Sequence, residues 1–123
     1  MTDTAIKYLS DIHYAISLID DFLESIENFR AYQSDLKTQS AVERQLGIIG
    51  EAVNKYRQEE NIATLSNDQQ MVNFRNRIIH SYDNIDVSIV WAILKNHLPI
   101  LKEEVNEILI QYNCRCSNTK TYY

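Results

Sequence analysis

Hydrophobic residues recur along most of this chain at steps of three and four positions, the spacing of one buried face of an α-helix. The pattern predicts a first helix over residues 4–27 and a second from about residue 42 toward residue 60. The stripe of the first comprises Ile12, Ala15, Ile16, Ile19, Phe22, Leu23 and Ile26. That of the second comprises Val42, Leu46, Ile49, Ala52, Val53 and Tyr56. Both stripes are expected to face one shared core.

A start signal precedes a third predicted helix, over residues 68–82. Ser66 is expected to be its N-cap, and Gln69, three residues later, is placed to bond back to the Ser66 backbone in a capping box. Polar residues at positions 83–84 then act as a stop signal. Asp86 is expected to cap a fourth helix, because its carboxylate meets unpaired N–H groups at the positive end of the helix dipole.

The fourth helix has the most regular stripe, over residues 87–112. Pro99 lies inside it and is predicted to kink or split it, since proline lacks an N–H and clashes with the preceding turn. Residues 113–123 carry no stripe, which predicts a flexible tail. We therefore expect one domain over residues 1–112, an all-α, antiparallel up-and-down helical bundle of four to five helices.

Glycine and proline are scarce, with two glycines and one proline in 123 residues. This composition disfavours the turns of β-hairpins and supports the all-helical prediction. It also excludes P-loop and Rossmann proteins, whose phosphate-binding loops need several glycines. Gly47 and Gly50 lie three residues apart inside the second helix, where each costs about 1 kcal/mol relative to alanine. We expect them to permit a close helix–helix contact.

Composition also bears on location and on metal binding. The chain shows no leader pattern and no apolar run of membrane-spanning length, so we expect a cytoplasmic protein with no membrane partner. Cys114 and Cys116 are too close in sequence to staple the fold, and they lack the further ligands of a structural zinc site. We predict no metal and no cofactor. The net charge of −5 argues against a general polyanion binder, so any RNA contact must be local.

Residues 71–82 form a basic island in this acidic chain, with two arginines, one histidine and no acidic residue. Helical spacing places Asn76 and Arg77 on the same face as His80, whereas Arg75 lies farther around the helix with a side chain long enough to reach a shared phosphate. The core-facing stripe of this helix comprises Met71, Phe74 and Ile78.

Arginine and histidine together suit the transphosphorylation of RNA, in which the 2′-hydroxyl loses a proton while negative charge builds on the phosphate. His80 would transfer the proton, an effect typically worth about 10²- to 10⁴-fold in rate. Arg75 would bind the phosphate and stabilise its charge without a metal. Asn76 and Arg77 would either support this site or satisfy the helix end. Because one chain supplies one such histidine, a homodimer that pairs two copies is predicted.

The sequence also resembles a known family, the HEPN-domain ribonuclease toxins of the HepT type. Their helical motif, Arg-x4-His-x-Tyr, is matched by Arg75, His80 and Tyr82. The resemblance covers roughly residues 7–110. Within that range the similar segments are residues 41–52, Ile89-Val90-Trp91 and Leu98-Pro99.

This resemblance implies a HEPN-like bundle, a homodimer with both motifs at a shared cleft, and metal-independent endoribonuclease activity that arrests growth as the toxin of a toxin–antitoxin system. It further implies a partner, a minimal nucleotidyltransferase antitoxin that attaches AMP to the motif tyrosine, here Tyr82. AMP groups two residues after His80 would add negative charge and bulk where RNA should enter.

Two other hypotheses remain open. The chain could be a non-catalytic HEPN module that binds a nucleotidyltransferase or nucleotides, or a helical dimerisation protein whose basic turn merely satisfies a helix end. The remaining polar and aromatic candidates are interpreted as structural, because lone charges and histidines beside an apolar stripe are usually solvated or paired. They are Arg44, Glu51, His13, His97 and Trp91.

Overall fold

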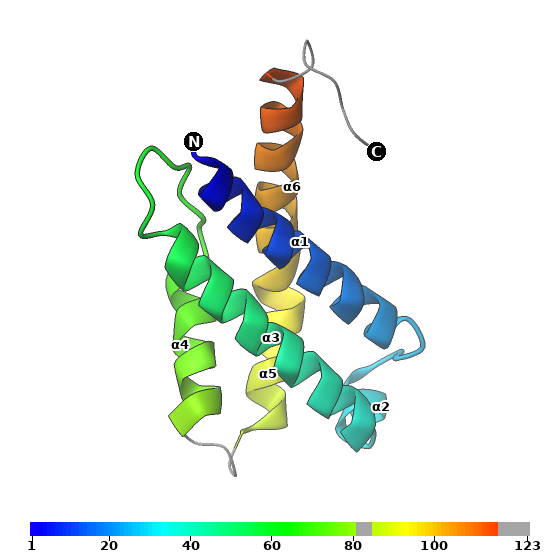
Figure 1. The fold of residues 1–123 in the computed structure, drawn as a ribbon. Helices are drawn as coiled ribbons and strands as arrows, with labels where there is room; N and C mark the ends of the chain where they lie inside the picture. The colour runs from blue at the N-terminus through cyan, green and yellow to red at the C-terminus, as the bar shows by residue number, and fades with distance from the viewer. Residues whose placement is uncertain (81–84, 116–123) are drawn as a thin grey trace.

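The computed structural model describes residues 1–80 and 85–115, and within these ranges it contains six α-helices and no strand (Figure 1). The all-α prediction is confirmed. The helices are α1 (Asp3–Leu23), α2 (Phe29–Gln33), α3 (Leu36–Tyr56), α4 (Asp68–His80), α5 (Val87–Asn96) and α6 (Leu98–Arg115). Among the described residues, no helix is both long and apolar enough to cross a lipid bilayer.

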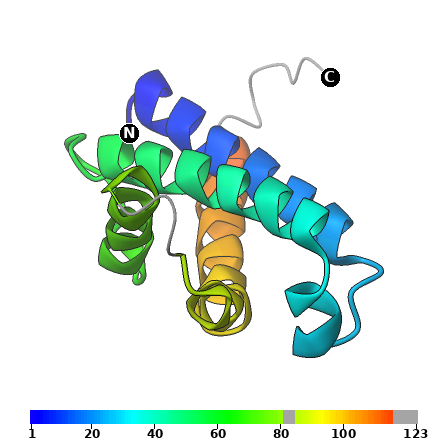
Figure 2. The same ribbon diagram turned by 90° about the horizontal axis from the view of Figure 1, so that it is seen from below.

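The helices form a bundle in two layers. α1 and α3 run side by side in opposite directions, and this pair lies across α4, α5 and α6 (Figures 1 and 2). The core fills the space between the layers. Every predicted stripe residue of α3 is buried, as are the first four of α1, whereas the α1 stripe beyond Ile19 is only partly buried. Periodicity therefore identified the faces that meet.

The helix count exceeds the expected four to five because of the short helix α2, which the hydrophobic pattern did not predict. α2 lies in a polar stretch, and its Asn28 cap accepts from the N–H of Ala31, while Phe29 and Tyr32 pack their rings against Trp91 of α5. The last long helix is split between α5 and α6, as predicted. Pro99 is the second residue of α6, where its missing N–H is not needed.

The helix ends confirm one predicted cap and correct another. Asp86 accepts from the N–H of Ser88 at 2.9 Å and caps α5. Ser66 does not form the predicted capping box with Gln69: its N–H lies 3.0 Å from a carboxylate oxygen of Glu104 on α6, and its hydroxyl contacts the same carboxylate. Gln69 accepts from Arg57 instead, at 3.0 Å. Contacts with residues distant in sequence therefore replace the capping box predicted between Ser66 and Gln69.

The C-terminal boundary also differs in detail. Residues 113–115, expected to belong to a tail, continue α6. The rest of that predicted tail, residues 116–123 with Cys116, lies outside the described part of the chain.

Candidate active site

Arg75 occupies the middle of α4, where this helix packs most closely against α3. A Cβ added to Gly50 of α3 would collide with Cβ of Arg75 and lie 2.7 Å from the carbonyl oxygen of Met71. Only glycine allows this approach, so the prediction of a close helix contact is confirmed at Gly50. At Gly47 the corresponding Cβ would meet Ile78 at 3.8 Å, an ordinary contact that requires no glycine.

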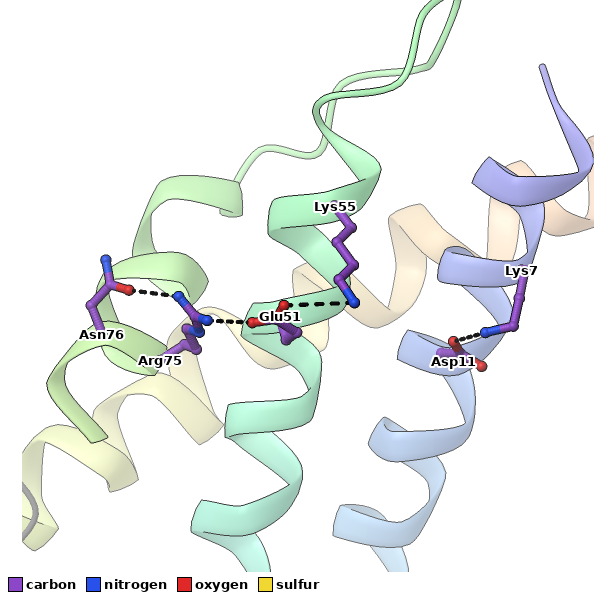
Figure 3. Close-up of polar contacts among 6 residues, drawn as sticks. All are labelled: Lys7, Asp11, Glu51, Lys55, Arg75 and Asn76. Atoms are coloured by element: carbon purple, nitrogen blue, oxygen red, sulfur yellow. Dashed lines mark hydrogen bonds and ion pairs between the residues drawn. The ribbon is translucent and has the colours of Figure 1, made fainter. Parts of the chain in front are cut away.

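The guanidinium of Arg75 is held at its tip by two neighbours (Figure 3). Its Nη2 lies 2.5 Å from Oε2 of Glu51, and its Nη1 donates to Oδ1 of Asn76 at 3.1 Å. The second oxygen of Glu51 pairs with Lys55 Nζ at 3.7 Å. Arg75 is 27% exposed and Glu51 40%, so the cluster is accessible to a ligand.

Glu51 is therefore a site residue that sequence reasoning set aside as an ordinary charge. Its position next to Gly50 was the available signal: the residue beside the closest point of two helices can reach across to the neighbouring helix. That signal has meaning only once α3 and α4 are known to meet there.

An open groove of about 1000 Å³ runs along this cluster, between α1, α3 and α4. Arg75, Glu51 and Lys55 line one side, and Lys7 and Asp11 of α1, an ion pair at 3.2 Å, line the other (Figure 3). Apolar side chains lie among these charges and remain exposed. They are Tyr14 at 66%, Ile48 at 39% and Ile79 at 53%. The groove thus combines an arginine held by Glu51 and Asn76 with several exposed apolar side chains.

The other predicted site residues have fewer described contacts than Arg75. His80 is the last residue of α4, exposed and outside the groove lining, and its side chain forms no hydrogen bond or ion pair with a described residue. Asn76 supports Arg75 directly. Arg77 is exposed and does not join them. Tyr82 lies outside the described residues.

Arg77 instead acts on the start of α5. The pKa of the Asp86 carboxyl is held below its usual range by hydrogen bonds from the hydroxyl and N–H of Ser88, with a smaller contribution from the charge of Arg77. Asn76 and Arg77 thus interact with Arg75 and Asp86 respectively, and their supporting role beside His80 stays a prediction.

Burial alters one carboxyl of the groove. Partial burial raises the pKa of Glu43, which lines the groove on α3.

Outside the groove, His97 bonds to Asn67 through Nδ1 at 2.8 Å, a structural role at the α5–α6 junction. No group of three or more potential metal ligands occurs among the described residues.

Comparison with known proteins identifies the family of this chain. A model of the family described as "Ribonuclease HepT-like" matches residues 12–108. A protein of Thermococcus cleftensis named "Probable ribonuclease HepT" is 35% identical over 102 residues, covering 82% of this chain and 92% of the relative.

Two proteins of Methanocaldococcus jannaschii, each named as a putative RNase, are 34% and 32% identical. They align over 83% and 80% of this chain and over 84% and 90% of their own lengths. No solved structure matches. The matched region contains the whole groove wall of α3 and α4 together with Arg75 and His80, and on this evidence the chain belongs to the HepT-like ribonuclease family.

Proposed function

We propose that this ribonuclease is an endoribonuclease toxin that cleaves RNA by metal-independent transphosphorylation, with Arg75 and His80 as its catalytic residues. The observation that carries the proposal is the Arg75 guanidinium, fixed in the wall of an open groove in a HepT-like ribonuclease. An arginine held in this way is suited to a phosphate, because its planar fork offers five donors and its partners here use only some of them.

The chemistry assigns one task to each residue. The ribose 2′-oxygen loses its proton to a base and attacks the adjacent phosphorus, and the bond from phosphorus to the 5′-oxygen breaks as that oxygen gains a proton. Histidine is suited to both proton transfers near neutral pH. Arg75 stabilises the negative charge that develops on the phosphate oxygens. The products carry a 2′,3′-cyclic phosphate and a 5′-hydroxyl.

A homodimer completes this site. One chain contributes one motif histidine, whereas transphosphorylation profits from both a base and an acid. The exposed Tyr14, Ile48 and Ile79 give the groove an apolar surface that a second copy would cover. His80 lies one residue beyond Ile79, so pairing through this surface would bring two copies of the motif together.

The dimer is tested with a matched pair of substitutions. Ile79→Asp and Ile110→Asp each place a charge on an isoleucine that is 53% exposed, the first in the groove and the second near the end of α6. Sedimentation analysis should show that Ile79→Asp alone is monomeric, and that it alone loses cleavage. A dimer unaffected by Ile79→Asp would contradict this interface.

The proposed regulation uses Tyr82, the third residue of the motif. A minimal nucleotidyltransferase antitoxin would attach AMP to it, which puts negative phosphate two residues from His80 and close to the path of RNA. Co-expression with such an enzyme should add AMP-sized mass increments that Tyr82→Phe abolishes. We further propose that both proteins act in the cytoplasm. Unmodified Tyr82 under these conditions would contradict the regulation alone.

The central experiment is RNA cleavage in EDTA with purified protein. The wild type should cut RNA and leave cyclic phosphate ends, whereas Arg75→Ala and His80→Ala should not. Arg57→Ala and His13→Ala are matched controls, because each removes the same kind of side chain outside the groove and the motif. Cleavage that survives in both motif variants would overturn the proposal. Binding of a nucleotidyltransferase without any cleavage would favour a non-catalytic module.

A further inference from the structure

We propose that Glu51 is a positioning residue of the active site, which holds the Arg75 guanidinium in place, and that Lys55 restores the positive charge that Glu51 removes. This inference rests on the proposed function of Arg75 and deepens it. Glu51 touches Arg75 and not the reacting phosphate, so its contribution acts through the arginine.

Arg75 is fixed at both ends of its side chain by consecutive residues of α3. Near the backbone, Gly50 leaves no spare room beside Cβ and Cγ of Arg75, so the direction in which the side chain leaves α4 is set. At the tip, the carboxylate of Glu51 binds Nη2 at 2.5 Å. An arginine side chain otherwise loses much rotational freedom when it binds a phosphate, and prior fixation lowers that loss.

Fixation by a carboxylate has an electrostatic drawback, because Glu51 neutralises the arginine that must attract a phosphate. Lys55, one turn along α3, pairs with the other oxygen of Glu51 at 3.7 Å. Two cations sharing one anion leave a single net positive charge on this wall of the groove. The arrangement therefore combines a rigid guanidinium with a remaining attraction for RNA.

The opposite wall provides a contrast. Lys7 and Asp11 also form an ion pair one turn apart on one helix, but their side chains are more exposed, at 71% and 46%, and no bond links them to Arg75 or His80, the two motif residues that the structure describes. That pair is an ordinary exposed one, which usually contributes little. The contact with Arg75 is what distinguishes Glu51.

The test compares Glu51→Gln with Asp20→Asn. Each change replaces a carboxylate by an amide of the same shape, and Asp20 is a matched control because its partner, Lys102 on α6, lies outside the groove. Circular dichroism and sedimentation would confirm that fold and assembly are retained. Glu51→Gln should lower kcat by about tenfold or more, because the guanidinium loses its anchor. The KM for RNA should not rise, because the wall gains positive charge.

A merely structural role for Glu51 would not separate kcat from KM in this way. The second readout is nuclear magnetic resonance of the Arg75 guanidinium without RNA, in which restricted rotation of its Nη groups should be lost in Glu51→Gln and kept in Asp20→Asn. Unchanged kcat, or unchanged rotation, would overturn the inference. If the wild type cuts no RNA, the proposed function fails, and the rotation measurement still decides whether Glu51 holds Arg75.

Discussion

Arg75 and His80 lie five residues apart on the same helix and differ in how far the single chain completes them. α3 contacts Arg75 at both ends of its side chain, with Gly50 against Cβ and Glu51 at the guanidinium. His80 is exposed at the end of α4, and its side chain has no polar partner among the described residues. Of the two proposed catalytic groups, the guanidinium that would stabilise charge is held by contacts within one chain, whereas the imidazole that would move a proton has no such contact with a described side chain.

Substitutions of the motif residues His80 and Arg75 are expected to have the largest effects on RNA cleavage, for different reasons. His80→Ala should reduce cleavage by about 10²- to 10⁴-fold, and imidazole in solution should restore part of it, because the position is open. Arg75→Lys keeps the charge but should still lose about 10²-fold, since an ammonium cannot bind Glu51 and a phosphate with one planar fork. Measured kcat/KM with and without imidazole checks both. An Arg75→Lys enzyme as active as the wild type would show that charge alone suffices.

A smaller effect concerns the packing that sets Arg75. Gly50→Ala should lower the free energy of unfolding by about 1–3 kcal/mol, because the added methyl group overlaps Arg75 and the Met71 carbonyl and α4 must shift. Gly47→Ala is the matched control on the same helix and should be neutral or stabilising by up to about 1 kcal/mol. Chemical denaturation measures both. Equal stability of the two variants would contradict the close α3–α4 contact.

The smallest effect lies at the start of α5, just beyond the motif. Asp86→Ala should lower the Tm modestly at pH 7, because the N–H of Ser88 loses its acceptor. Since the folded state lowers the pKa of Asp86, its stabilisation is present above the ordinary pKa of about 3.9 and is lost as the pH falls through the lowered value. The Tm gap between variant and wild type should therefore close in acid.

The control for this cap is Asp21→Ala, which removes an exposed carboxylate at the end of α1 that caps no helix. Its Tm difference from the wild type should be near zero at pH 7. A gap for Asp86→Ala that stayed constant from pH 7 to strongly acidic pH would contradict the role of the ionised cap.

Patterns along the chain predicted most of the fold. The stripes of α1 and α3, the Asp86 cap and the break near Pro99 depend on residues close in sequence, so local rules apply to them. The helix α2 was missed because it is held by rings that meet Trp91, a contact between residues about sixty positions apart. Ser66 was misassigned for the same reason, since its partner Glu104 belongs to a distant helix.

By itself, the sequence determined that this chain is helical, that it carries one basic motif, and that it resembles the HepT-like ribonucleases. Helical periodicity and motif spacing depend on residues close together in the sequence, so they can be recognised without a structure. Only the tertiary structure decided that Glu51 meets Arg75 and that Gly50 makes room for it. The meeting of two charges depends on how two helices cross, and many packings of the same stripes would have kept these residues apart.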